Sequence, residues 1–87
     1  MSQVLPKRIA DESALQELVH QLTIDYLEHF HINKQPENVY RKIVDEIENT
    51  LFSTTMKFTF GNQSKAAEYL GINRATLRTK LKHHNLM

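Results

Sequence analysis

The 87-residue sequence contains no cysteine and no tryptophan, and only two glycines and two prolines. Without cysteine, the chain can form neither a disulfide scaffold nor a zinc site built on thiolates. The scarcity of glycine and proline excludes collagen-like and linker compositions. No apolar run approaches the roughly 18 residues that a membrane-spanning helix needs. The N-terminal segment also lacks the apolar core of a signal peptide, so we expect a small cytoplasmic domain.

Positive charge is concentrated at the C-terminal end of the chain. Residues 61–87 hold five Lys or Arg and one Glu, a net charge of +4, whereas residues 1–60 hold six basic and nine acidic residues, a net charge of −3. A basic end on an acidic body is typical of a protein whose end meets a polyanion. Nucleic acid is therefore a candidate partner, although a solvated basic helix would explain the same charges.

Apolar residues before residue 61 recur with the period of an α-helix. The first series, within residues 11–30, comprises Leu15, Leu18, Val19, Leu22, Tyr26 and Phe30. The second series, within residues 37–60, comprises Tyr40, Ile43, Val44, Ile47, Leu51 and Phe58. Both spacings place the apolar side chains on one helix face, which strand alternation does not explain. Pro36 suits the first position of the second helix, and Gly61 suits its C-terminal end.

Two amphipathic helices leave more apolar surface than one short C-terminal segment can cover. A chain of this size buries only about 60% of its unfolded surface, so it is marginally stable alone. A two-fold homodimer would cover the remaining apolar faces, and a compact monomer of three or four helices is the alternative. The residues that we expect at the dimer interface are Leu15, Leu18, Leu22, Tyr26, Tyr40, Ile43, Ile47 and Leu51.

The last 27 residues predict two short helices joined through one glycine. Asn62 and Asn73 suit the N-caps of helices over residues 63–70 and 74–83. Gly71 suits the turn between them, because glycine adopts the left-handed conformation at no steric cost. Two short helices joined in this way form a helix-turn-helix. We expect Ala67, which is small, where the helices cross, with Leu77 and Leu81 facing inward.

This motif predicts DNA binding. Its second helix lies in the major groove with its N-terminal residues at the base edges, and Arg74 occupies that position. The N-terminus of the first helix, near residues 62–64, offers N–H groups and a positive dipole to a phosphate. A plain helical hairpin is the alternative. The outward or flanking residues are Arg74, Thr76, Arg78, Thr79, Lys80 and Lys82, with His83 and His84 expected beside the phosphate backbone.

Residues 61–82, GNQSKAAEYLGINRATLRTKLK, closely resemble the C-terminal helix-turn-helix of the Fis (factor for inversion stimulation) family, which are bacterial nucleoid-associated proteins. The likeness is most specific at residues 61–63 and 71–74, and it continues more weakly through residues 36–60. The same motif ends the enhancer-binding activators of the NtrC type, which are much longer and carry an ATPase domain. A chain of this length fits a stand-alone Fis-like protein better than a regulatory fragment of that type.

The resemblance implies an all-α chain of four helices, in which the first two helices of two copies intertwine. The two recognition helices of such a dimer lie closer together than one DNA turn, so DNA must bend to meet both. Arg74 would read a guanine, and Asn73 would lie beside a nearby base. Phosphates would be held by Asn62, Gln63, Ser64, Lys65, Thr76, Arg78, Lys80 and Lys82. The implied function is a DNA-bending, sequence-preferring transcriptional regulator of the nucleoid.

The sequence departs from the family pattern at several positions. Thr79 and His83 stand where the family often has lysine, so we expect weaker binding to the DNA backbone. Thr50 replaces a proline that kinks the second helix in the best-known members, so we expect a straighter helix. Residues 1–10, interpreted as a mobile tail, leave little room for the β-hairpin arm of members that stimulate recombination.

No enzyme and no cofactor are predicted, because the sequence has no Gly-rich phosphate loop, nucleophile elbow or paired-carboxylate pocket. Asp25 and His29 share a helix face, with Glu28 and His31 nearby, but two ligands do not fill a tetrahedral site. We therefore assign no metal site. A protein-interaction module remains an alternative to DNA binding. RNA is a weaker one, because Tyr69 is the single aromatic residue of the basic segment and provides no stacking platform.

Overall fold

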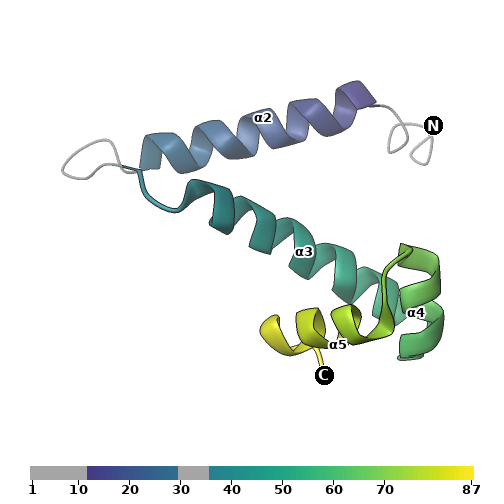
Figure 1. Ribbon diagram of the computed structural model, residues 1–87. Coiled ribbons are helices and arrows are strands. Elements are labelled where there is room, and N and C mark those ends of the chain that lie inside the picture. Colours follow the sequence, from purple (N-terminus) through teal and green to yellow (C-terminus); the bar gives the residue numbers. More distant parts are fainter. Residues whose placement is uncertain (1–11, 30–35) are drawn as a thin grey trace. The chain divides into compact units, whose positions relative to one another are not determined.

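A computed structural model describes residues 12–29 and 36–87 of the chain (Figure 1). This part contains helices α2 (Glu12–His29), α3 (Val39–Phe58), α4 (Gln63–Leu70) and α5 (Arg74–His83). No strand occurs within these ranges, and the predicted all-α class with four helices is confirmed. The prediction of a mobile tail over residues 1–10 lies outside the described residues.

Contacts divide the chain into two compact units, Met1–Ile43 and Val44–Met87. The boundary falls inside α3. The reason is that Phe52, in the C-terminal half of α3, shares a core with α4 and α5. The second unit is therefore the helix-turn-helix together with the part of α3 on which it rests.

The apolar series of helix α2 is partly exposed to solvent in the single chain. Leu15 is 59% exposed and Leu18 is 70% exposed, whereas Leu22 and Tyr26 are partly buried. A helix of this kind gains most of its stability from packing its apolar face rather than from intrinsic propensity. The exposed leucines of α2 therefore mark a face suited to a further contact.

Helix α3 begins later than predicted and ends earlier, at Phe58, because Phe60 already has a left-handed φ of +54°. It starts at Val39, so Pro36 precedes it and the prediction that this proline occupies the first helical position is wrong. The carbonyl of Asn38 instead accepts the N–H of Lys42 at 3.0 Å, and Asn38 has a φ of +56°, which asparagine tolerates better than most residues. At the other end, Gly61 has a φ of +82° and donates its N–H to the Met56 carbonyl at 2.9 Å.

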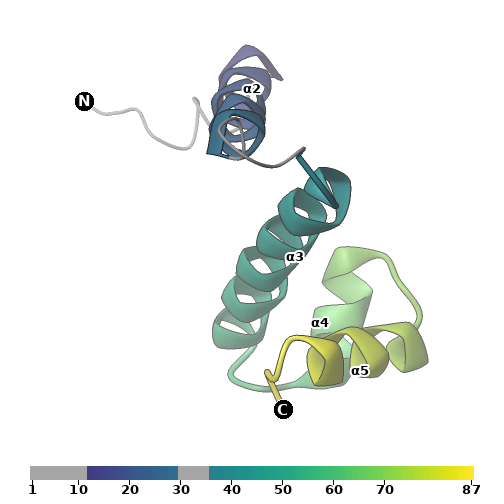
Figure 2. The same ribbon diagram turned by 90° about the vertical axis from the view of Figure 1, so that its left-hand side faces the viewer.

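The core of the second unit joins three helices. Phe52 from α3 packs with Ala66 and Ala67 of α4 and with Leu77 and Leu81 of α5. Both leucines are 0% exposed, which confirms the prediction that they face inward. Full burial of one leucine stabilises a fold by about 1.5–3 kcal/mol. Figures 1 and 2 both show α4 and α5 beside the C-terminal half of α3, so the opposite face of α5 is left for solvent or a ligand.

Candidate nucleic-acid interface

Asn62 caps the N-terminus of α4. The Asn62 side chain accepts the N–H of Lys65 at 3.0 Å, and its carbonyl accepts the N–H of Ala66 at the same distance. The first-turn N–H groups of a helix have no partner within the helix, and they carry the positive end of its dipole. Gln63 is partly buried and Ser64 is exposed at this end. The end of α4 can therefore offer donors to an anion.

The turn between α4 and α5 follows the predicted design. Gly71 has a φ of +74°, and its N–H and that of Ile72 both donate to the Ala67 carbonyl, at 2.9 and 3.0 Å. A β-carbon on Gly71 would meet no atom within 4 Å, so the position needs glycine for its backbone conformation. Asn73 then caps α5, its side-chain oxygen accepting the N–H of Ala75 at 2.7 Å.

Six of the residues predicted to meet DNA lie exposed along α5. They are Arg74, Thr76, Arg78, Thr79, Lys82 and His83. Arg78 donates a hydrogen bond to Gln63 Oε1 at 2.9 Å and so joins the exposed surfaces of α5 and α4. The Thr79 hydroxyl donates to the Ala75 carbonyl at 3.1 Å, within its own helix. The structure thus brings the N-terminus of α4 and the polar face of α5 together into one surface.

Lys80 is turned toward α3. Its Nζ lies 3.0 Å from Glu48 Oε2, and 39% of its side chain is exposed. A phosphate contact by Lys80 would have to compete with this ion pair. Among the predicted contacts that the structure describes, Lys80 and His83 each lie near a carboxylate of α3.

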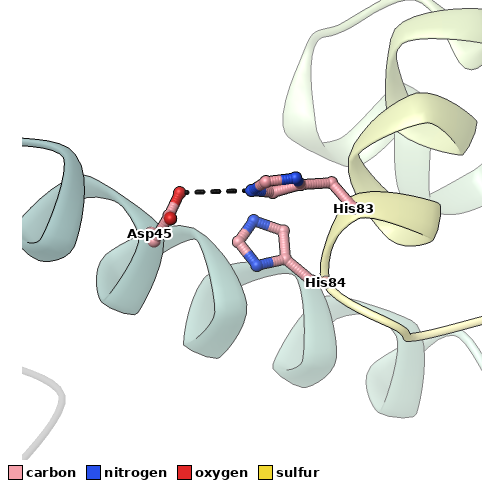
Figure 3. A group of neighbouring side chains, drawn as sticks. All are labelled: Asp45, His83 and His84. Atoms are coloured by element: carbon pink, nitrogen blue, oxygen red, sulfur yellow. Dashed lines mark hydrogen bonds and ion pairs between the residues drawn. The ribbon is translucent and has the colours of Figure 1, made fainter.

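The two adjacent histidines occupy different environments. His83 is exposed, and its Nε2 lies 3.4 Å from Asp45 Oδ1 (Figure 3). The His84 side chain is only 4% exposed; its ring packs near Phe52, with centroids 6.1 Å apart, and its Nε2 lies 3.0 Å from Glu48 Oε1. The expectation that His84 flanks the phosphate backbone is therefore wrong, because packing against the aromatic ring of Phe52 and the pair with Glu48 hold it inside.

Glu48 is the centre of this charged group. The hydrogen bond with His84 lowers the pKa of its carboxyl group, and Lys80 lowers it further through a hydrogen bond and its charge, while partial burial acts in the opposite direction. Glu48 therefore stays ionised at neutral pH. Sequence spacing alone does not group these residues, because 32 and 36 positions separate Glu48 from Lys80 and His84. The adjacent histidines, and the i, i+3 spacing of Asp45 and Glu48, were the available signals.

Within residues 12–29 and 36–87, none of the helices combines the length and the apolar character needed to cross a membrane.

Residues 43–84 match the family described as bacterial regulatory protein, Fis family. The chain is 50% identical over 54 residues to a protein of Ralstonia nicotianae described as Fis-like and DNA-binding, an alignment that covers 62% of this chain and 70% of the relative. It is 40% identical over 72 residues to the DNA-binding protein Fis of Glaesserella parasuis, an alignment that covers 83% of this chain and 72% of the relative. A third relative, a Fis-like DNA-binding protein of Pseudomonas aeruginosa, is 47% identical over 58 residues. This alignment covers 66% of this chain and 56% of the relative.

No solved structure matches the chain. The matched family is one of regulatory proteins, and no enzyme family is indicated. The match spans the second unit from α3 to the end of α5, so it includes the capped turn and the exposed basic face.

Proposed function

The chain belongs to the Fis family of bacterial regulatory proteins, and we propose that it binds double-stranded DNA through α5. The observation that carries the proposal is the position of Arg74. It is exposed at the first residue of α5, while Leu77 and Leu81 hold that helix in the core. A helix held in this way presents its N-terminal side chains to the major groove.

Base recognition is assigned to Arg74 and Asn73. Arginine pairs with the O6 and N7 atoms of guanine through two hydrogen bonds, the commonest specific contact in the major groove. The side-chain oxygen of Asn73 is occupied by the N–H of Ala75, so its NH₂ group is what it offers to a base. Asn73 would therefore donate to a base acceptor, and Arg74 would set the preference for guanine.

Phosphate contacts are assigned to the surface shared by α4 and α5. The N–H groups at the start of α4 face an anion favourably, and the hydrogen bond from Arg78 to Gln63 keeps the two helices in register there. The remaining phosphate contacts that we propose are from Asn62, Ser64, Lys65, Thr76, Thr79, Lys82 and His83. Lys80 would contribute less than an unpaired lysine, because Glu48 opposes its charge.

We propose that the DNA-binding form is a homodimer. In the single chain, apolar side chains of the predicted interface are exposed: Leu15 by 59%, Leu18 by 70%, Tyr40 by 82%, Ile47 by 44% and Leu51 by 46%. Leu22, Tyr26 and Ile43, the other members of that set, are partly buried. Apolar side chains exposed in such number along two helices are costly in water, and a second copy offers the same self-complementary surface.

The dimer gives the proposed mechanism of regulation. Two recognition helices spaced by less than a DNA turn, as the family resemblance implies, engage successive major grooves only on bent DNA. The preference of the protein for one DNA sequence over another would then depend partly on how easily the central base pairs deform. The protein would act in the bacterial nucleoid as a DNA-bending regulator of transcription. A helical module that binds only other proteins is the alternative.

A gel-shift series tests the proposal. Duplexes of about 25 bp, long enough for two half-sites one turn apart, would carry either flexible pyrimidine–purine steps or a stiff A-tract between the half-sites. We expect two chains per duplex, tighter binding to the flexible duplex, and a log K that falls linearly with log salt by about 0.9 per phosphate neutralised. Absence of any shift at low salt would overturn DNA binding. One chain per duplex would overturn the dimer alone.

A further inference from the structure

Three metal-binding side chains converge where α3 meets the end of α5. Asp45, His83 and His84 each offer one ligand atom, and these atoms all lie within 4.8 Å of one another. Figure 3 shows the carboxylate of Asp45 pointing toward the ring of His83, with His84 beside it. The ligands come from two helices of the same compact unit, and 38 positions separate Asp45 from His83.

The separation of Asp45 and His83 is that of two ligands that share one ion. Zinc–nitrogen and zinc–oxygen bonds of about 2.0–2.1 Å place tetrahedral ligands about 3.3 Å apart. His83 Nε2 lies 3.4 Å from Asp45 Oδ1, and His84 Nε2 lies 3.0 Å from Glu48 Oε1. Small side-chain rotations that bring these two pairs together would complete a set of two imidazoles and two carboxylates.

The site is partly preorganised. The His84 side chain is almost fully buried, packs near Phe52, and lies edge-on to His83 with ring centroids 4.7 Å apart. Lys80 holds the second oxygen of Glu48 at 3.0 Å, which orients this carboxylate toward His84. Such outer contacts fix the direction of a metal ligand and support its affinity.

Charge also favours a cation here. With neutral histidines, Asp45 and Glu48 contribute two negative charges and Lys80 one positive charge. His83 is the last residue of α5, where the helix dipole is negative and stabilises a cation. In each of the two carboxylate–histidine pairs, a hydrogen bond requires a proton on the imidazole Nε2 atom. A metal ion bound there would replace that proton.

We propose that Asp45, His83 and His84, with Glu48, bind one divalent transition-metal ion of the zinc class. Imidazole ligands suit zinc, copper and nickel, whereas magnesium and calcium prefer sites made only of oxygen. The ion would link α3 to the end of α5. This inference goes beyond DNA binding and does not depend on it.

Calorimetric and thermal titrations of the EDTA-treated, desalted chain with zinc chloride test the proposal. We expect one zinc ion per chain and a rise in Tm that EDTA reverses, with no such response to magnesium chloride. Asp45 and His83 are partly exposed, so Asp45→Asn and His83→Gln should fold, as circular dichroism can verify. Each should weaken zinc binding on the order of tenfold or more, the cost of losing one ligand.

His20→Gln is the matched control, because His20 is an exposed histidine on α2 and outside the cluster. It should bind zinc as the unaltered chain does. Failure of zinc to bind, equal responses to zinc and magnesium, or unchanged zinc affinity in both Asp45→Asn and His83→Gln would overturn the proposal. DNA affinity of the EDTA-treated chain, measured separately, keeps this outcome distinct from that of the proposed function.

Discussion

Lys80 of α5 and Glu48 of α3 form an ion pair 3.0 Å long, so a lysine of the proposed recognition helix points toward the protein's own scaffold. The other oxygen of Glu48 lies 3.0 Å from Nε2 of His84, which is in the turn that follows α5. Glu48 therefore ties two side chains from the end of the DNA-binding motif to α3. The charge of Lys80 is therefore already paired with a carboxylate, whereas Lys82 on the same helix is exposed.

Lys82 and Lys80 should differ in their effect on the salt dependence of DNA binding. Lys82 is exposed, so Lys82→Ala should weaken binding evenly across sequences and reduce the slope of log K against log salt by about one. Lys80→Ala should reduce that slope by less, because Glu48 already neutralises part of its charge. Fluorescence anisotropy at several salt concentrations measures both slopes. Equal reductions would mean that Lys80 leaves Glu48 on binding DNA.

Stability at acid pH should depend on Glu48. Its pKa in the folded protein is lowered, first by the hydrogen bond with His84 and then by Lys80. The ionised carboxylate therefore stabilises the fold above the ordinary glutamate pKa, and this contribution is lost as the pH falls through the lowered value. In EDTA, the difference in unfolding free energy between the unaltered chain and Glu48→Gln should shrink over that interval.

The matched control for this measurement is Glu17→Gln, which changes an exposed glutamate of α2. Urea unfolding at a series of pH values, followed by circular dichroism, gives the required free energies. A constant difference between the unaltered chain and Glu48→Gln at every pH would contradict the role assigned to the Glu48 carboxylate.

Arg74→Ala should weaken binding to a preferred site by about 1–3 kcal/mol and relax the preference for guanine. The reason is that Arg74 is exposed at the start of α5, where its guanidinium can reach base edges. Anisotropy titrations on paired duplexes, with guanine or adenine at the half-site edge, measure both effects. Lys82→Ala serves as the comparison, since it should lower both affinities equally. If Arg74→Ala lowered the affinity for the guanine and adenine duplexes equally, Arg74 would not read the base.

Local signals were sufficient to predict the helix-turn-helix. Asn62, Gly71 and Asn73 each act through hydrogen bonds to residues no more than four positions away, so their types alone indicate the caps and the turn. Leu77 and Leu81 followed from helix periodicity. Pro36 gave the wrong start for α3, which begins three residues later at Val39.

The contacts around Glu48 could not be predicted in this way. Lys80 and His84 are 32 and 36 positions from it, and they meet it only because Phe52 brings α3 into the core with α4 and α5. A charged residue on a helix is usually solvated, and sequence spacing gives no reason to pair it with another helix. The same packing brings Asp45 to His83, so the proposed metal cluster also depends on tertiary contacts.

Ile47→Asp should convert the dimer to a monomer and abolish cooperative DNA binding. Ile47 is 44% exposed in the single chain, so a single chain tolerates aspartate there, whereas a dimer interface would bury an unpaired charge at considerable cost. Sedimentation velocity gives the oligomeric state, and circular dichroism checks that the helices persist. Lys57→Asp, an exposed change on the same helix, is the control and should remain dimeric. If Ile47→Asp also sediments as a dimer, the interface must lie on another face of α3, and the expected approach of the two recognition helices would be lost with it.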